Sequence, residues 1–156
     1  MQRIDAGVTL VEMVIVFVLV GIITAIALPK LANSTDVLAV RSARQEVASY
    51  ITQARALSIQ TGRIARFVRD SNVIQLTVTS TSGATTLAAS QNLGAGNGVT
   101  LAAVPSDTIT FDPRGVLLAG ASTTSPRIRI SRNGVQDSVC VVGWGKVSIS
   151  QCQLAQ

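Results

Sequence analysis

The sequence contains no histidine, and this absence excludes several kinds of catalytic site. Ser–His–Asp and Cys–His systems both need an imidazole to take the proton from the nucleophile. A closed zinc site is also excluded, because two cysteines do not supply the four ligands that zinc requires. We therefore expect a protein that is not an enzyme and that needs no metal or cofactor.

Carboxylates are scarce beyond residue 62, where each stands beside turn residues: Asp70, Asp107, Asp112 and Asp137. We interpret these aspartates as turn formers rather than as acid–base groups. The glycine-rich "GAGNG", residues 94–98, is followed by the strand-like "VTLAAV" and not by a helix that opens with Lys-Ser or Lys-Thr. We therefore expect a loop there, with at most a short strand in residues 80–98, and no phosphate-binding site.

Aromatic residues make up 3% of the chain and charged residues 13%, against 47% hydrophobic residues. Much of the apolar excess lies in residues 8–28. The rest of the chain has the composition of one rather polar domain with a small hydrophobic core. The two cysteines, Cys140 and Cys152, lie near the C-terminus. If that part lies outside the cytoplasm, we favour a disulfide, which contributes about 3 kcal/mol, over two buried thiols.

The net charge is +5, mostly from arginine, which is compatible with an acidic partner such as nucleic acid or anionic lipid. Two groups of arginines lie in strand-like segments: Arg63, Arg66 and Arg69, and Arg127, Arg129 and Arg132. On adjacent strands they would form a basic stripe able to contact phosphates. Interleaved aromatics for base stacking are missing, so we favour solvated edge-strand charges.

An apolar run extends from Val8 to Leu28, 21 residues that would form about 30 Å of helix. Three interpretations are open: a secretory signal cleaved near "AIA" (residues 25–27), a single-pass anchor, or a segment cut before the run. Glu12 and the nearly uncharged leader, residues 1–7, argue against the first. A plain single-pass anchor does not explain Glu12, because placing a carboxylate at the centre of a bilayer costs about 2.5–3.5 kcal/mol of insertion free energy.

A cut after Gly7 would supply a partner for Glu12. The new amine of Val8 would lie four residues from the glutamate, within one helix or between packed copies. Such a pair among apolar helices would fix their register.

Residues 31–61 have a helical pattern. The apolar positions are spaced by three and four residues: Val40, Ala43, Val47, Tyr50, Ala54 and Leu57, with Ile51 widening the stripe. Gly62 is a natural end. "NSTD", residues 33–36, could cap the start of a new helix after Pro29, so we expect a bend or break of the helix there. We expect Gly21 to be either a second bend or a position of close helix packing.

From Arg63 the pattern changes to the alternation typical of strands. A hairpin is predicted for "RIARFVRD" and "VIQLTVT". The strand-like "TITF" is followed by "DPRG", a type I turn. The alternation in "RIRIS" places Ile128 and Ile130 on one face of a strand. The predicted fold class is α+β, with a long N-terminal helix on an antiparallel, sandwich-like head. We expect a leader (1–7), a transmembrane helix (8–29), an amphipathic helix (30–62) and a β-rich head (63–156).

The stretch "G-VTLVE-MVIVFVLVGIITAIALP" resembles the class III signal of type IV pilins and pseudopilins. The matching positions are Gly7, Thr9, Leu10, Glu12 and Pro29. The resemblance implies that a prepilin peptidase cuts between Gly7 and Val8 and methylates the amine of Val8. Val8 stands where phenylalanine is commonest in that family.

The later segments "SARQEVASYITQARALSIQTGR", "ITFDPRGVL" and "RIRISRNGVQDSVCVVGWGKVSIS" resemble GspH/FimT minor pilins and pseudopilins. This implies a subunit in the inner membrane, with a periplasmic head, that primes or caps a filament and contacts other pilins through its helix. Some members of this group bind DNA through a Gly-Arg-x-Arg motif, where this sequence reads "GKVS", residues 145–148. DNA contact would then involve Arg127, Arg129, Arg132 and Lys146.

We therefore expect a minor type IV pilin. The alternatives are a type II secretion pseudopilin, a DNA-binding tip pilin and a secreted domain whose signal has been removed.

Overall fold

The structure is a computed structural model that describes residues 9–80, 82–83, 85–118, 125–142 and 144–149, with only the backbone described for residues 27–33. The chain divides into two compact units, Met1–Thr35 and Asp36–Gln156. We call the second unit the head. Each unit is described by itself below.

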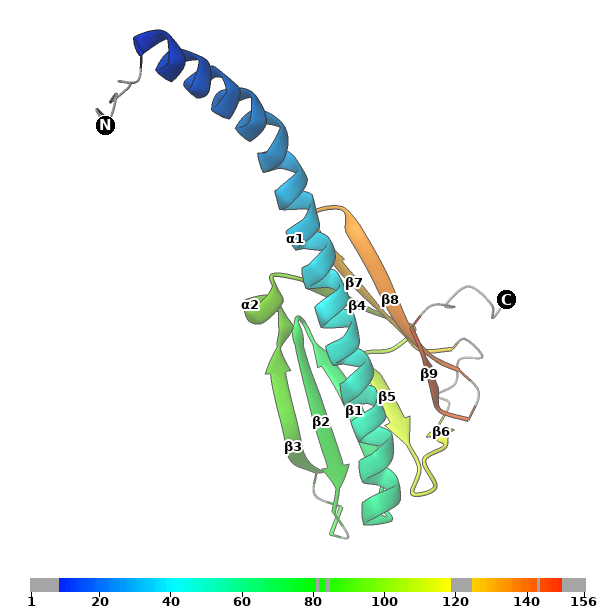
Figure 1. Cartoon of the computed structure of the whole chain (residues 1–156). Helices are drawn as coiled ribbons and strands as arrows, with labels where there is room; N and C mark the ends of the chain where they lie inside the picture. Colours follow the sequence, from blue (N-terminus) through cyan, green and yellow to red (C-terminus); the bar gives the residue numbers. More distant parts are fainter. Residues whose placement is uncertain (1–8, 81, 84, 119–124, 143, 150–156) are drawn as a thin grey trace, which may run out of the picture. The chain divides into compact units, whose positions relative to one another are not determined.

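Helix α1 runs from Leu10 to Thr61 without interruption (Figure 1). The predicted fresh start at residues 33–36 is therefore wrong, because α1 continues through Pro29 and through residues 33–36. The predicted end at Gly62 is confirmed. Gly62 has a φ of 62°, and the Arg63 N–H donates to the Ser58 carbonyl at 3.2 Å, as in a Schellman motif.

Five strands form the first sheet of the head, sheet A. They are β1 (Ala65–Asp70), β2 (Val73–Thr79), β3 (Thr85–Asn92), β5 (Thr108–Phe111) and β6 (Leu117–Leu118). Their spatial order is β3-β2-β1-β5-β6, and neighbours are antiparallel. The predicted hairpin of β1 and β2 is confirmed, with Asp70 opposite Val73.

Four strands form sheet B in the antiparallel order β4-β7-β8-β9. They are β4 (Thr100–Val104), β7 (Arg127–Arg132), β8 (Val135–Val142) and β9 (Lys146–Ser148). Ile128 and Ile130 are fully buried while Arg129 is exposed, so the predicted alternation in β7 is confirmed.

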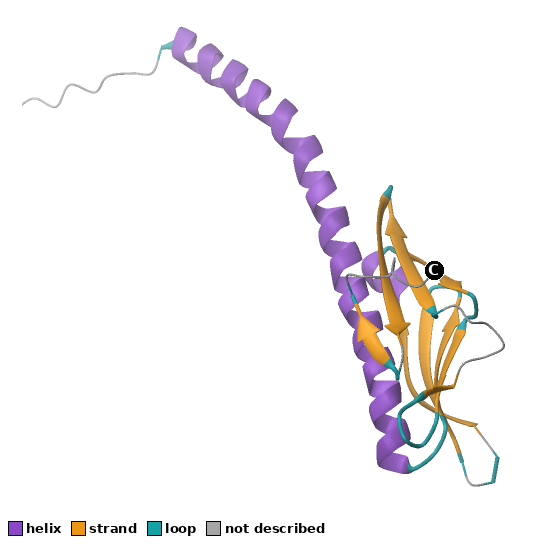
Figure 2. Ribbon diagram, turned by 90° about the vertical axis from the view of Figure 1, so that its right-hand side faces the viewer, coloured by secondary structure: helices purple, strands orange, loops and turns teal. Residues whose placement is uncertain are grey.

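A single apolar cluster joins the head part of α1 to both sheets. Figure 2 shows the strands on one side of this part of the helix. The predicted stripe is confirmed, since Val40, Ala43, Val47, Ile51 and Ala54 are all at most 1% exposed. They pack with Phe67, Phe111 and the aliphatic residues of both sheets.

The loop predicted for residues 80–98 is wrong over most of its length. Strand β3 occupies Thr85–Asn92, and a short helix, α2, follows at Leu93–Asn97. The Asn92 side chain accepts a hydrogen bond from the Ala95 N–H at 3.0 Å and so caps α2. Gly98 ends it with a φ of 62°.

Candidate functional site: the assembly helix and the basic strands

Thr9 directly precedes the first residue of helix α1. Its hydroxyl accepts a hydrogen bond from the Glu12 N–H at 3.2 Å, and its carbonyl accepts one from the Met13 N–H at 3.3 Å. This is the geometry of an N-cap, and Thr-Leu-Val-Glu has the spacing of a capping box. Glu12 therefore lies in the first turn, where the helix dipole favours a negative charge.

The first part of α1, from Leu10 to Ile26, exposes apolar side chains on every side of the helix. Exposed fractions of its large hydrophobic side chains run from 47% at Val16 to 80% at Leu10. Glu12 is the single charged residue in this segment and is exposed. None of the helices within the described residues meets the length and hydropathy of a membrane span.

The predicted cleavage and methylation positions, Gly7 and Val8, lie outside the described residues. Gly21 and Pro29 both lie within the continuous helix α1. An added Cβ at Gly21 would meet no described atom within 4 Å, so the chain itself does not require close packing there. A bend at either position stays a prediction.

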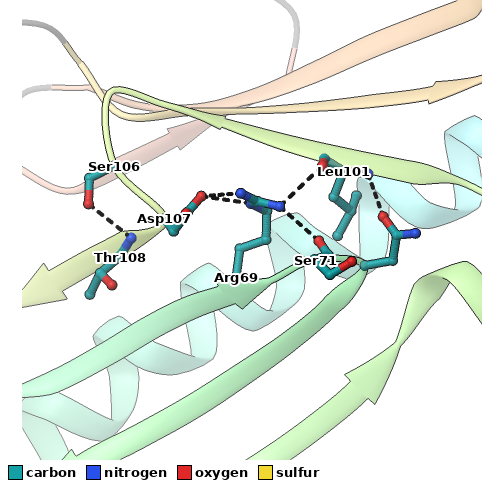
Figure 3. A network of polar contacts seen from close by, with 7 residues as sticks. Arg69, Ser71, Leu101, Ser106, Asp107 and Thr108 are labelled. Atoms are coloured by element: carbon teal, nitrogen blue, oxygen red, sulfur yellow. Dashed lines mark hydrogen bonds and ion pairs between the residues drawn. The ribbon is translucent and has the colours of Figure 1, made fainter.

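The two groups of arginines do not form one stripe. Strand β1, with Arg66 and Arg69, lies in sheet A, whereas β7 lies in sheet B. Figure 3 shows how Arg69 is used instead: its guanidinium donates to Asp107, to the Ser71 carbonyl at 2.9 Å and to the Leu101 carbonyl at 3.3 Å. Arg69 thus links β1 to β4 of the other sheet.

Arg132, another candidate for DNA contact, is also used within the head. Its Nε lies 2.7 Å from Asp36 Oδ1, and the Asn133 side chain donates to Asp36 Oδ2 at 3.1 Å. Arg132 Nη1 donates to the Asn97 carbonyl. Asp36 is only 9% exposed, so this network binds α1 to β7 and makes Arg132 a structural residue.

The other three candidate cations share the outer face of sheet B. Arg127 pairs with Cys140 and Arg129 with Ser138 on β8, while Lys146 pairs with Val142 on the same strand. Cys140, Ser138 and Val142 alternate along β8, so all three cations lie on one face. The opposite face carries Ile128, Ile130 and Val139 toward the core.

Cys140 lies in β8 and is 4% exposed, and no described cysteine is free. Cys152 lies outside the described residues, so the pairing of Cys140 with Cys152 stays a prediction.

Three of the four predicted turn aspartates form ion pairs within the head, and the fourth, Asp70, is the exposed last residue of β1. Asp107 and Asp112 stand in turns, as predicted, and pair with Arg69 and Arg114. Asp137 was wrongly predicted as a turn residue: it lies within β8 and binds Arg44 of α1 at 2.7 Å. In the described part of the chain, no three potential ligands gather into a metal-binding group.

Asp112 organises the turn between β5 and β6. Its Oδ1 accepts hydrogen bonds from the Val116 N–H at 2.8 Å and the Arg114 N–H at 2.9 Å, and Arg114 Nε lies 3.1 Å from Oδ2. The bond from Val116 is the main cause that lowers the pKa of Asp112 below 3.8, with the bonds and charge of Arg114 assisting.

Two residues acquire a role only in the structure. The cap formed by Thr9 was signalled by the Thr-x-x-Glu spacing before an apolar run. Trp144, the only tryptophan, stands in the β8–β9 turn with 79% of its surface exposed. Its position between two glycines in the sequence signalled a turn but not its exposure.

Solved structures with the same fold are those of the type IV minor pilin FimU from Pseudomonas aeruginosa strain PAO1. One crystal form is 16% identical to this chain, with a TM-score of 0.58, and the similarity covers 75% of this chain and 92% of FimU. A second form is 17% identical, with a TM-score of 0.55 and coverages of 74% and 96%. This likeness confirms the predicted pilin-like α+β fold.

Two family models match the sequence. The prokaryotic N-terminal methylation motif matches residues 2–28, and the model of type II transport protein GspH matches residues 43–145. No curated protein matches. Together the two models span both the helix and the head, and the chain therefore belongs to the GspH family of type IV pilin-like proteins.

Proposed function

We propose that this chain is a minor type IV pilin that enters a filament through the first part of α1. The observation that carries this proposal is the apolar surface from Leu10 to Ile26, which surrounds the helix and includes one charge, Glu12. A helix that is apolar all round is stable only among lipids or other apolar helices. A subunit held in the inner membrane and then packed into a filament meets both environments in turn.

Cleavage between Gly7 and Val8 would prepare the subunit for this transfer. The bond lies just before the capping residue Thr9, so the cut leaves the first turn of α1 and its cap intact. The freed amine, methylated at Val8, would meet the carboxylate of Glu12 on a neighbouring subunit. Because lipid strongly disfavours an unpaired carboxylate, this pairing would favour the packed state and fix its register.

Glu12 variants test the assembly role. Glu12→Gln keeps a side chain suited to the capping box but removes the charge, and Glu12→Ala removes both. We expect both variants to be inserted and cleaved but to be several-fold depleted in purified filaments, as measured by immunoblotting against the membrane fraction. Thr9→Ser, which retains the capping hydroxyl, is the matched control and should assemble normally. Normal assembly of Glu12→Gln would overturn the role of the charge.

N-terminal sequencing of the mature protein separates this proposal from a secreted domain. A mature chain that starts at Val8 supports the pilin, whereas a start at Leu28 means removal of the entire apolar run as a secretory signal.

A pseudopilin of a type II secretion system is the second candidate, because the GspH family is described as a type II transport protein. A strain that lacks this chain distinguishes the two machines. Loss of surface pili with normal protein secretion supports the pilus, and the reverse result supports the secretion system. In either machine the subunit would prime or cap the filament, and its head would lie in the periplasm.

DNA binding by the head is the third candidate, favoured by Arg127, Arg129 and Lys146 on one face of sheet B. Salt-dependent binding of the full chain in detergent to double-stranded DNA, lost when all three cations are replaced, would support it. Absence of binding at low salt would dispose of it.

A further inference from the structure

Trp144 is exposed, but the residue that follows it, Gly145, is closely packed within the head. The next residue, Gly145, accepts a hydrogen bond from Arg55 Nη1 at 3.3 Å and has a φ of 89°. A Cβ at Gly145 would lie 2.9 Å from the Gly115 carbonyl oxygen and 3.1 Å from Phe111. Gly145 therefore packs against the β5–β6 turn and is hydrogen-bonded to α1, so Trp144 stands next to this contact in the chain.

The surroundings of Trp144 are apolar and positively charged. A Cβ at Gly115 would touch Ile59 Cδ1 at 2.6 Å and Arg55 Cγ at 3.3 Å, so these two side chains lie at the contact between the turns. Ile59 is 53% exposed. Arg114 precedes Gly115 and Lys146 follows Gly145 in the sequence, and both are exposed. We call Arg55, Ile59, Arg114, Trp144 and Lys146 the Trp144 patch.

The described carboxylate next to this patch, Asp112, is already hydrogen-bonded within its own turn. It is 8% exposed and accepts hydrogen bonds from Arg114 and the backbone of its own turn. The exposed surface of the patch thus combines a large aromatic group, an aliphatic side chain and an excess of positive charge. Tryptophan and arginine are enriched among the residues that contribute most to binding at protein–protein interfaces.

From this juxtaposition we infer that the Trp144 patch docks an acidic, partly apolar segment of a different subunit of the same filament. The inference rests on the proposed function, which supplies the neighbouring subunits. A second copy of this chain does not fit, because its nearest carboxylates in sequence, Asp107 and Asp112, are five positions apart and both are paired. Single-stranded nucleic acid fits less well, since it needs successive aromatics along a basic track.

Photo-crosslinking tests this docking in the full chain. Trp144 is replaced with p-benzoylphenylalanine, filaments are purified and irradiated, and the cross-linked peptides are mapped by mass spectrometry. Leu87, which is 55% exposed on β3 of sheet A, takes the same replacement as the matched control position. We expect position 144 to cross-link a segment of another subunit that carries several Asp or Glu residues, and position 87 not to reach that segment.

A charge reversal provides the second readout. Arg114→Glu combined with Lys146→Glu should lower the cross-link yield from position 144 by about fivefold or more, because the acidic segment would face like charges. Arg41→Glu, a single reversal at an exposed position of α1 outside the patch, should leave the yield unchanged.

The outcomes separate this inference from the proposed function. Suppose that the chain is present in filaments but that position 144 yields no cross-link to an acidic segment of another subunit. Whether it then cross-links nothing, nucleic acid, lipid, a second copy or a segment without acidic residues, the docking inference is wrong and the pilin proposal stands. If the unmodified chain is absent from filaments, the proposed function itself fails.

Discussion

At the scale of single residues, several polar side chains are placed to hold turns rather than to react. Asp112 is the clearest case, because two backbone N–H groups and Arg114 all donate to its carboxylate. The lowered pKa of this group follows from these bonds. Its ionised form therefore stabilises the folded head.

We expect this stabilisation to depend on pH. Because the folded pKa of Asp112 lies below its ordinary value of 3.8, its contribution is complete above that value and is lost as the pH falls through the folded pKa. Asp112→Asn should thus lower the melting temperature at pH 7, and the difference from the wild type should narrow below about pH 4. Thermal unfolding followed by circular dichroism measures both, with the exposed Asp70→Asn as the control for loss of charge. A difference that does not change with pH would contradict this account.

Gly145 provides the second residue-scale prediction. Gly145→Ala forces a side chain into positive φ and against the Gly115 carbonyl, whereas Gly134, with a φ of 85°, has no described atom within 4 Å of an added Cβ. Gly134→Ala should cost about 1–2 kcal/mol from backbone strain alone. Gly145→Ala should cost about 1–3 kcal/mol more, from steric overlap. Urea denaturation of the full chain in detergent compares the two, and equal losses would mean that the contact between the turns is unimportant.

At the scale of elements, the N-terminal residues of the head part of α1 are bound by ion pairs as well as by apolar contacts. Asp36 with Arg132 and Arg44 with Asp137 both join α1 to sheet B, at 2.7 Å in each case. These pairs connect residues more than 90 positions apart in the sequence. No local pattern predicts such partners, so the sequence alone does not separate the structural role of Arg132 from DNA contact.

The pair of Asp36 and Arg132 should contribute more than an exposed pair. Asp36→Ala leaves the partly buried Arg132 without its carboxylate, so we expect a loss of about 1–3 kcal/mol and faster amide hydrogen exchange in residues 36–43. Arg114→Ala is the comparison, because the Arg114 side chain is 85% exposed and its loss should cost about 0–1 kcal/mol. Unchanged exchange in Asp36→Ala would mean that apolar packing alone holds this end of the helix segment.

Prediction of the elements succeeded where the hydrophobic pattern was regular and failed where it was not. Strand β7 and the head part of α1 have clear periods of two and of three to four residues, and both were found. Strand β3, "TTLAASQN", lacks that alternation because almost all of its side chains are exposed. Its existence depends on pairing with β2, which is information that the segment itself does not hold. Helix α2 does carry local signals, because Asn92 and Gly98 cap its two ends, but both residue types are also common in loops.

At the scale of the whole molecule, the sequence was sufficient to predict a long helix joined to a β-rich head, because the apolar run and the strand rhythm occupy separate regions. It did not predict that the arginine groups would lie in different sheets, because the order of strands in space is set by tertiary packing. The first part of the helix is the reverse case: its proposed role follows from the sequence, and the structure adds the cap at Thr9.

The predicted disulfide is a property of the whole head, since it would join the end of the chain to the outer face of sheet B at Cys140. We expect reductant to lower the stability of the full chain by about 3 kcal/mol. Cys152→Ser should be destabilised to the same extent and should no longer respond to reductant. A wild-type melting temperature that is the same with and without reductant would show that the bond does not form.

The continuity of α1 also determines how the subunit bears mechanical load. The apolar positions that would sit in the filament and the core positions Val40 to Ala54 belong to one uninterrupted helix. Tension applied to the first part of α1 would therefore be carried by continuous helical backbone into the head segment, where a row of buried side chains packs on two sheets. Contacts loaded in parallel share the force, so the helix segment should detach from the sheets only when the whole row of side chains slips as a unit.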